Sequence, residues 1–270
     1  MIPDPIDSTV LHAQAGIATF EHLDEAETTM DRARAVAADP ATPLPALVVA
    51  DRQVCGRGRR GARWWQPEGA LVASLVLDGA VVGGSPIRPT WSLACGVALA
   101  EALASVEPAL APRVRWPNDV EIDGGKLAGI LVETVPGGRV IFGIGVNTTG
   151  SAAEAPAGIG RRIATVPDVV GRGLPREQVL VAFVPRLIAL LAGMAAADGL
   201  LVARYRPLCS LTGSDVTVYR GLGTGDTVRG PCLGIDRYGA LVLDTVAGRL
   251  HVESGSLSDP AAAWHGEADA

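Results

Sequence analysis

A short glycine- and arginine-rich segment between two strand-like runs limits the folds that this chain can adopt. Residues 56–61 read Gly-Arg-Gly-Arg-Arg-Gly and match the G-x-G-x-x-G fingerprint of dinucleotide-binding folds. In those folds the third glycine lies in a helix of several turns, whose N-terminus faces a pyrophosphate. Here only residues 62–69, which include Trp64 and Pro67, precede the next apolar run. No such helix fits, so we do not expect a Rossmann fold.

The arginines of this segment favour a loop that binds anions with side chains as well as backbone. Arg57, Arg59, Arg60 and Arg63 lie close together in a chain whose formal net charge is −6. Guanidinium groups donate paired hydrogen bonds to carboxylate and phosphate oxygens, and glycines let a loop fold closely over a ligand. A solvated turn and an RGG-like RNA-binding segment are the alternatives. We interpret residues 56–61 as a phosphate- and carboxylate-binding loop.

The composition indicates a globular protein with a large core. With 270 residues, 48% of them hydrophobic, the chain has room for one large domain and a small one. Its negative net charge argues against nucleic-acid binding as the main function, because phosphate neutralisation needs a basic face. No apolar run reaches the ~18 residues of a membrane span, and the N-terminus lacks a signal-peptide pattern. We expect a cytoplasmic protein that does not act at a membrane.

The cysteines and histidines form no pattern typical of a metal site or a catalytic triad. Cys55, Cys95, Cys209 and Cys232 lack a CxxC spacing, and the four histidines lie far apart. We expect reduced thiols, no zinc site and no histidine-based triad.

The periodicity of apolar residues predicts an α+β fold with a separate small β module. Thr28 and Thr29 stand where N-caps are expected, before a helix over 30–38. A further helix is predicted over 91–106 and one long helix or two over 175–206, interrupted by Pro185. Strands are predicted over 47–54, 70–77, 113–122, 126–134 and 139–146. Short strands over 215–220, 227–235, 240–245 and 249–253 predict the β module. The predicted domains are 17–208 and 209–257, with flexible tails at 1–16 and 258–270.

Lys126 is the only lysine of the chain, and the other 22 of its 23 basic residues are arginine. Lysine is a compact, mobile point charge, whereas arginine is a broad planar fork, so the two are not interchangeable. Lys126 follows Asp119 after a turn-rich linker and leads directly into an apolar strand. Drift in an arginine-biased composition is the simpler interpretation. The surroundings favour a functional role.

Three segments together resemble the signature of the biotin protein ligases. They are residues 50–61, which end in the Gly-Arg-Gly-Arg-Arg-Gly loop, residues 115–119 (Arg-Trp-Pro-Asn-Asp) and residues 126–133 (Lys-Leu-Ala-Gly-Ile-Leu-Val-Glu). Residues 143–147, Gly-Ile-Gly-Val-Asn, resemble the family's following strand. The resemblance covers about residues 17–257, and both the order and the spacing of the motifs match.

The resemblance implies a class II aminoacyl-tRNA synthetase-like catalytic domain, with a mixed sheet flanked by helices, and a C-terminal SH3-like β-barrel. It also implies a two-step reaction. Biotin and MgATP would give biotinyl-5′-AMP and pyrophosphate, and a lysine of a biotin carboxyl carrier domain would then attack the acyl-adenylate. The implied ligands are ATP with Mg²⁺ and biotin, the implied partner is the carrier protein, and a homodimer is left open.

Carried over by motif, the resemblance assigns roles to individual residues. Thr28 and Thr29 with Gln53 would hold the ureido ring, and Trp64 would pack near the adenine. Lys126 would contact the biotin carboxylate and the α-phosphate oxygens. The implied catalytic residues are Lys126, Arg57 and Arg59; the implied biotin-binding residues are Thr28, Thr29, Met30, Gln53, Gly56, Arg57, Gly58, Arg59, Lys126 and Gly129; the implied ATP-binding residues are Arg59, Arg60, Trp64, Asn118, Asp119, Lys126 and Asn147. The motifs do not indicate metal ligands.

The chain departs from the family pattern in several places. Met30 stands where the family often has asparagine, Arg115 replaces the usual lysine, and Ala62 replaces an arginine of some members. Residues 158–170 match the family poorly, and we assign them no role. The chain begins almost directly with the predicted catalytic domain, without room for the winged helix of members that repress transcription, so we expect no operator DNA binding.

Two alternatives to a biotin ligase stay open at this point. One is a lipoate- or octanoate-transferring enzyme of the same superfold, which the arginine loop and the C-terminal module disfavour. The other is a non-catalytic protein that binds biotinyl-adenylate or a carrier domain. The presence of Lys126, Arg57, Arg59 and Asn118 argues against it.

The scarcity of lysine also bears on side reactions of a ligase. If the acyl-adenylate leaves the site, only Lys126 or the N-terminus can be labelled, so we expect very little self-biotinylation. Mass spectrometry that finds biotin at several other positions would contradict this expectation.

We predict that Lys126→Arg lowers adenylate formation by about two orders of magnitude, because losing one preorganised donor at a developing charge costs about 3 to 4 kcal/mol of activation energy. Steady-state pyrophosphate release measures the change. Near-normal turnover of the variant would reject the role of Lys126.

Overall fold

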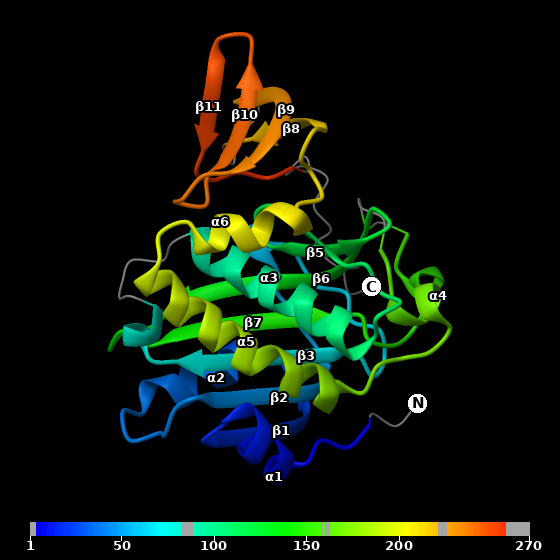
Figure 1. The fold of residues 1–270 in the computed structure, drawn as a ribbon. Helices are drawn as coiled ribbons and strands as arrows, with labels where there is room; N and C mark the ends of the chain where they lie inside the picture. The colour runs from blue at the N-terminus through cyan, green and yellow to red at the C-terminus, as the bar shows by residue number, and fades with distance from the viewer. Residues whose placement is uncertain (1–3, 83–88, 158, 160–162, 221–225, 258–270) are drawn as a thin grey trace.

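The computed structural model describes residues 4–82, 89–157, 159, 163–220 and 226–257, which form two sheets with flanking helices (Figure 1). The larger sheet is mixed, with strand order β1-β2-β3-β7-β6-β5-β4. β1 and β2 pair in parallel, and the other neighbours pair antiparallel. Its strands are β1 (Thr19–Ala26), β2 (Ala46–Gln53), β3 (Leu71–Leu77), β4 (Arg113–Arg115), β5 (Asp119–Ile122), β6 (Gly125–Thr134) and β7 (Val140–Val146).

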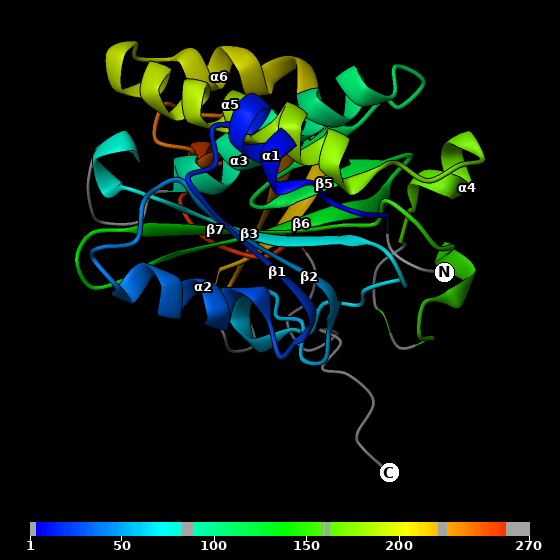
Figure 2. The same cartoon turned by 90° about the horizontal axis from the view of Figure 1, so that it is seen from below.

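Helices cover both faces of this sheet, α2 (Thr29–Ala38) on one side and α3 (Pro89–Val106) with α5 (Arg176–Ala196) on the other (Figure 2). Strand side chains alternate between the two faces. In β2, Leu47 and Val49 therefore join the large core with α3 and α5, while Ala46 and Val48 join a smaller cluster with α2. The remaining α-helices are α1 (Ser8–Val10), α4 (Val166–Val170) and α6 (Leu200–Tyr205). The predicted helices over 30–38 and 91–106 are confirmed.

By length and composition alone, α3 and α5 are each apolar and long enough to cross a membrane. No such run was expected from the sequence. The two helices pack against each other, and α3 also packs on β6. Core helices of globular proteins meet the same criterion, so the finding is weak evidence for a membrane span.

The connection between β2 and β3 excludes a Rossmann unit, as predicted. The two strands pair antiparallel, and the segment between them contains only a single turn of 3₁₀-helix, η2 (Arg59–Gly61), where a Rossmann fold needs a longer helix.

Three elements differ from the prediction. The strand expected over 113–122 is divided into β4 and β5, because the intervening residues form a turn at Pro117. The helix α5 continues through Pro185, because its buried side chains, such as Phe183 and Leu187, anchor both sides of the proline in the core. β1 was not predicted, because an edge strand with mostly polar residues gives a weak apolar pattern.

The N-terminal arm is ordered, which corrects the prediction of a flexible tail at 1–16 for residues 4–16. Arg176, which is fully buried, donates from Nε to Asp4 Oδ1 at 3.0 Å and from Nη1 to Asp51 Oδ1 at 2.7 Å. Leu11 and Ala15 of the arm are buried in the core. The arm therefore belongs to the larger domain, and the other expected tail, 258–270, lies outside the described residues.

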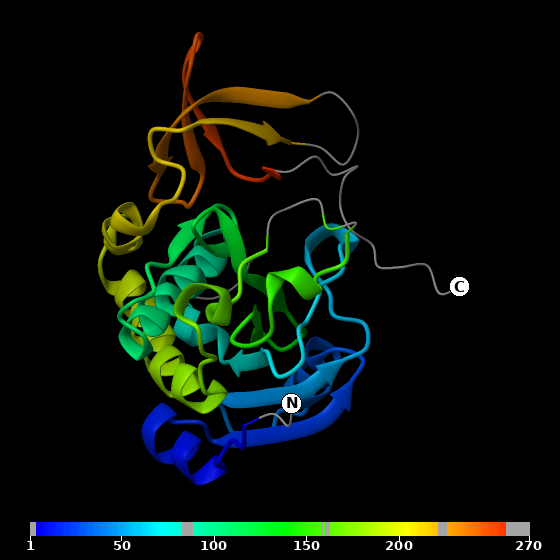
Figure 3. The ribbon, with the colours of Figure 1, turned by 90° about the vertical axis from the view of Figure 1, so that its right-hand side faces the viewer.

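The C-terminal module is an antiparallel sheet of strand order β11-β10-β9-β8, standing beside the larger domain (Figure 3). Its strands are β8 (Asp215–Tyr219), β9 (Thr227–Ile235), β10 (Leu241–Thr245) and β11 (Gly248–Val252), close to the predicted ranges. Trp116 Nε1 donates to Gly239 O at 3.1 Å, and Arg113 Nη2 donates to Cys209 O at 2.8 Å. These bonds join the module to the edge of the large sheet that ends in β4. All four cysteines are free thiols.

Arg176→Ala should lower the free energy of unfolding by about 2 to 3 kcal/mol, less than the loss of a fully buried ion pair, because Asp4 and Asp51 retain some solvent contact. Denaturant unfolding measures the loss. The matched control is Arg32→Ala, which removes a more exposed ion pair with Glu21 and should cost less than about 1 kcal/mol.

The pH dependence of stability gives a second readout of the same network. Burial opposes ionisation of Asp51, but hydrogen bonds from His22 and Arg176 outweigh it and lower the pKa of Asp51. The resulting stabilisation is present above the pKa of the unfolded state and is lost as pH falls through the lowered folded-state pKa. Arg176→Ala should therefore weaken the acid dependence of stability. If the stability of Arg176→Ala fell with decreasing pH as steeply as that of the natural protein, the result would contradict the network.

Candidate active site

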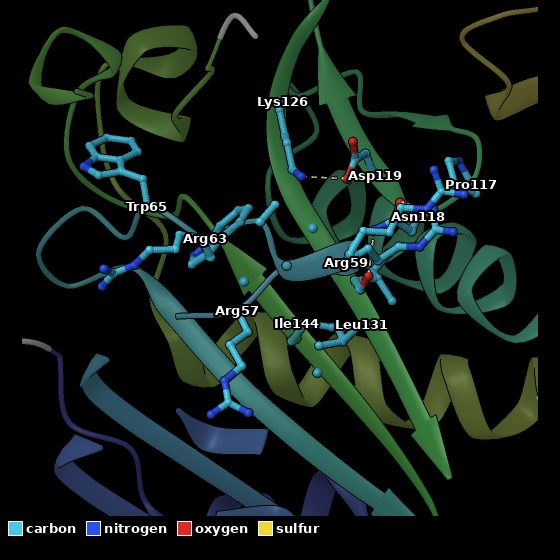
Figure 4. A pocket seen from close by; sticks show the side chains of 18 of the residues that line it. Arg57, Arg59, Arg63, Trp65, Pro117, Asn118, Asp119, Lys126, Leu131 and Ile144 are labelled. Carbon is cyan, nitrogen blue, oxygen red and sulfur yellow. Dashed lines mark hydrogen bonds and ion pairs between the residues drawn. The ribbon is translucent and has the colours of Figure 1, made fainter. Parts of the chain in front are cut away.

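A cavity of ≈430 Å³ opens on the sheet face that carries α2, beyond the N-terminus of that helix. Its walls come from α2, the loop after β2, the strands β5 to β7 and the C-terminal module. This size is typical of a small-ligand site. Figure 4 shows Arg57, Arg59, Asn118, Asp119 and Lys126 around it.

A β-bulge places Lys126 in this cavity. Along the β5–β6 pair, Val120 lies opposite Ala128, but the next residue, Glu121, lies opposite Lys126. β6 therefore has one extra residue, Leu127, at this point, and the alternation of its side chains is interrupted. Leu127 and Ala128 are both buried in the core, while Lys126 lines the cavity.

The Lys126 ammonium is held from two sides. Nζ lies 2.8 Å from Asp119 Oδ1 (Figure 4), and it lies 5.4 Å from the centroid of the Trp64 ring. An aromatic face and a carboxylate both stabilise a cation. The cavity thus contains a positioned ammonium group.

Two facing glycines make room for Trp64. Gly129 of β6 and Gly145 of β7 pair with each other. A Cβ on Gly145 would lie 2.5 Å from Trp64 Cε2, and a Cβ on Gly129 would lie 3.0 Å from Trp64 Cζ3. The indole therefore lies against bare backbone, and its Nε1 is buried without a hydrogen-bond partner. A buried donor of this kind is costly unless a ligand or water satisfies it.

The arginine loop folds back on itself beside the cavity. Trp64 N donates to Gly56 O at 2.8 Å, and Gly58 N donates to Ala62 O at 2.6 Å. Gly56 thus closes the loop and does not line the cavity, which differs from its predicted place in the ligand site. The other predicted site residues do line it: Thr28, Thr29, Met30, Gln53, Arg57, Gly58, Arg59, Arg60, Trp64, Asn118, Asp119, Lys126, Gly129 and Asn147.

The two predicted catalytic arginines of the loop have different partners. Arg57 points away from Lys126 and forms a two-pronged ion pair with Asp31 of α2, at 3.0 and 3.2 Å. Arg59 Nη1 donates to Asn118 Oδ1 at 3.3 Å. Burial lowers the pKa of Arg59, as does the charge of Arg60, while Asp119 opposes the shift. A guanidinium remains charged nonetheless, so Arg59 is a poorly hydrated cation available to an anion.

The start of α2 is braced by a hydrogen-bond network. Thr28 caps the helix by accepting from Met30 N. Thr29 N and Oγ1 donate to Gln53 Oε1 at 2.8 and 3.2 Å, and Ser74 Oγ donates to Thr29 Oγ1 at 2.8 Å. Since Thr28, Thr29 and Gln53 line the cavity, this end of it presents fixed polar groups.

Asn147 connects the end of β7 to a segment that was assigned no role. Its Nδ2 donates to Ala164 O at 2.9 Å, and its backbone carbonyl accepts from Val166 N. This brings Ile159 and Ile163 to the cavity, so part of the segment 158–170 does line the site. Asn147 Oδ1 is buried without a hydrogen-bond partner. The asparagine was predicted from its motif, whereas the two isoleucines gave no signal beyond being apolar.

Residues of the C-terminal module complete the rim. Gly255, Ser256 and Leu257 line the cavity together with Trp116 and Arg115. The sequence analysis did not place the module at the site, because no motif indicates how two domains pack.

The described residues contain no group of three or more histidine, cysteine, aspartate or glutamate side chains that could hold a metal ion. The carboxylate at the centre of the cavity, Asp119, is paired with Lys126. The site therefore does not form an all-protein metal centre. Mg²⁺ commonly binds through substrate phosphates with few protein ligands, so this arrangement is compatible with an ion that arrives with a nucleotide.

Comparisons with known proteins agree on one family. A sequence model of the Biotin/lipoate A/B protein ligase family matches residues 27–148. The chain is 34% identical over 235 residues to a biotin–[acetyl-CoA-carboxylase] ligase of Paracoccus denitrificans, covering 83% of this chain and 94% of that protein. It is 33% identical to the enzyme of the same name from Mycobacterium tuberculosis, covering 77% of this chain and 76% of that protein.

The fold agrees with the sequence comparisons. The biotin protein ligase of Aquifex aeolicus, solved in complex with biotin and ATP, superimposes with a TM-score of 0.76 and 26% identity over 90% of this chain and 98% of that one. The mixed sheet with flanking helices and the separate small antiparallel sheet are thus shared with a biotin protein ligase. The chain belongs to the biotin protein ligase family.

Gly145→Ala should reduce adenylate formation by about tenfold to a hundredfold, because the new methyl group overpacks Trp64 and such strain costs about 1 to 3 kcal/mol. Gly129→Ala should have a smaller effect, since its Cβ has 0.5 Å more room (3.0 against 2.5 Å). Pyrophosphate release measures both.

The matched control for this series is Gly193→Ala on α5. Its Cβ would meet only the movable end of the Leu200 side chain, far from the cavity lining, and turnover should be unchanged. Equal activity of the Gly145 variant and this control would contradict the packing of Trp64 in the site.

Proposed function

We propose that this protein activates biotin with ATP and transfers it to a lysine of the biotin carboxyl carrier domain of biotin-dependent carboxylases. The observation that carries the proposal is one cavity that unites the three family motifs. Fixed polar groups at the start of α2 line it together with Lys126, Arg59 and Asn118. Such a site can bind a neutral polar ring and an anionic reacting centre at the same time.

Thr28, Thr29 and Gln53 are proposed to bind the ureido ring. Their side chains are already ordered by the N-cap bond and the Ser74–Thr29–Gln53 contacts, so little freedom is lost on binding. Met30 lies over Gly143, where a Cβ would be 2.6 Å from the Met30 Sδ atom. A thioether in place of an amide gives this part of the pocket an apolar wall suited to the ring and chain carbons of biotin.

Lys126 and Arg59 are proposed to bind the reacting centre in the first step. A carboxylate oxygen of biotin attacks the α-phosphorus of ATP, and the bond to pyrophosphate breaks. Negative charge grows on the phosphate oxygens, and preorganised cations in a partly buried site stabilise it. Mg²⁺ supplies further charge neutralisation on the phosphates, with which it enters the site.

Arg57, Gly58 and Arg60 are proposed to close over the carboxylate and phosphates, with Trp64 and Asn147 on the nucleotide side. Closure requires Arg57 to leave Asp31, and the exchange is inexpensive because exposed ion pairs contribute less than about 1 kcal/mol. The unsatisfied Trp64 Nε1 and Asn147 Oδ1 atoms are available to a bound ligand.

In the second step, the amine of the carrier lysine attacks the acyl carbon and AMP leaves. The carrier protein has to approach the open side of the cavity, where Gly255–Leu257 of the module form part of the rim. We further propose that the catalytic domain is class II aminoacyl-tRNA synthetase-like and that the module is an SH3-like barrel, because these are the folds implied by the motifs. A homodimer and a cytoplasmic location stay predictions.

The test is pyrophosphate release from MgATP by the purified protein, with biotin, lipoate and octanoate supplied in parallel. Release with biotin alone is expected, and it should be lost in Lys126→Arg. Response to lipoate or octanoate instead would favour the related acyl-transfer activity, for which the family model leaves room. Tight binding of biotinyl-5′-AMP with no release under any condition would identify a non-catalytic binder.

A further inference from the structure

The site keeps an amine next to the activated acyl group that it makes. Lys126 is the only lysine of the chain, and its Nζ lies in the cavity proposed to hold biotinyl-5′-AMP. Acyl-adenylates react with amines, which is the basis of the proposed transfer step. An enzyme built in this way has to prevent its own lysine from taking the biotinyl group.

The surroundings of Lys126 hold its nitrogen in a charge-assisted contact with a carboxylate. The Asp119 carboxylate lies at 2.8 Å, and the side chains are only 16% (Asp119) and 24% (Lys126) exposed, so water weakens the contact little. The face of Trp64 lies across from it. Attack on an acyl carbon needs the nitrogen lone pair, and a protonated nitrogen has none to offer.

We propose that Asp119 protects the enzyme from self-acylation at Lys126, and that Lys126 is the single side-chain amine at which this ligase can biotinylate itself. This inference rests on the proposed function, because it concerns the same acyl-adenylate. It adds a role to Asp119, whose implied task is in ATP binding, and it names a modification site.

The side reaction is balanced without any further reagent. A neutral Lys126 Nζ attacks the acyl carbon, an amide C–N bond forms, and the C–O bond to the phosphate breaks. AMP leaves with the bonding electron pair, and the nitrogen releases a proton to solvent. The product, biotinyl-Lys126, has lost the cation proposed to stabilise adenylate formation, so the reaction would inactivate the enzyme.

No other side chain of this sequence offers an amine to the acyl group. Every other basic residue apart from histidine is arginine, and a guanidinium does not deprotonate in proteins. Escaping adenylate therefore finds no other side-chain amine with which to form an amide, and only the terminal amine remains as a second amine target.

The experiment supplies preformed biotinyl-5′-AMP to the purified protein, without ATP, and maps biotinylated peptides by mass spectrometry over time. Asp119→Asn removes the carboxylate that contacts Nζ and should label Lys126 at least about tenfold faster than the natural protein, since this charge-assisted contact has to break before the nitrogen can attack. Asp119→Glu keeps a carboxylate and should stay unlabelled. Asp119→Asn combined with Lys126→Arg is the control for site assignment.

A second control shows that adenylate is present in reactive form. Arg249→Lys introduces an exposed lysine on β11, outside the residues that line the cavity, and it should become labelled while Lys126 does not. Equal labelling of Lys126 in the natural protein and Asp119→Asn would overturn the proposal.

Binding of the adenylate is measured by calorimetry for Asp119→Asn, Asp119→Ser and Asp119→Ala, and labelling is scored on those that retain it. A variant that still binds the adenylate but shows no labelling of Lys126 overturns the protective role. Loss of binding in all three also overturns it, since Asp119 would then act mainly in holding the ligand. Because ATP is absent, failure of the proposed activation step appears only in the separate pyrophosphate assay.

Discussion

The site depends on one irregularity in the sheet, the β-bulge at Leu127. A regular β6 would place Leu127 beside Gly129 in the cavity and direct Lys126 into the core. The extra residue keeps Leu127 and Ala128 among the buried apolar side chains and brings Lys126 to the same side as Asp119. Burying an unpaired ammonium in the core would be prohibitively costly, so the hydrophobic core itself fixes the register that exposes the lysine.

The same strands provide room as well as charge. The Gly129–Gly145 pair removes two side chains from neighbouring strands, and Trp64 occupies the space. The indole then forms a wall beside the Lys126 ammonium. Because the arginine loop is closed through the Gly56–Trp64 hydrogen bond, the position of Trp64 also positions the loop. The packing of β6 on β7 thus fixes Trp64, and Trp64 in turn fixes the arginine loop of residues 56–61.

Much of this arrangement could be predicted from the sequence, because short motifs with fixed spacing carry it. Apolar periodicity predicted most strands and the helices α2 and α3, and every site residue taken from the motifs, apart from Gly56, lines the cavity. The bulge could not be predicted, since it would show in the sequence only as a shift in an alternating polar and apolar pattern. Residues 126–129, Lys-Leu-Ala-Gly, have no such alternation. The contributions of Ile159, Ile163 and the C-terminal module depend on tertiary packing. The ordered arm depends on a buried arginine, Arg176, whose partners lie more than a hundred residues away in the chain.

The central claim is that the face of β5 to β7 beside α2 holds the acyl-adenylate, with its phosphate at Lys126. A crystal structure of the protein with biotinyl-5′-AMP tests it most directly. The account predicts the ureido ring at Thr28 and Thr29, the acyl chain beside Met30, and the phosphate within hydrogen-bonding distance of Lys126 and Arg59. A ligand bound elsewhere, or a Lys126 side chain that faces away from the phosphate, would contradict it.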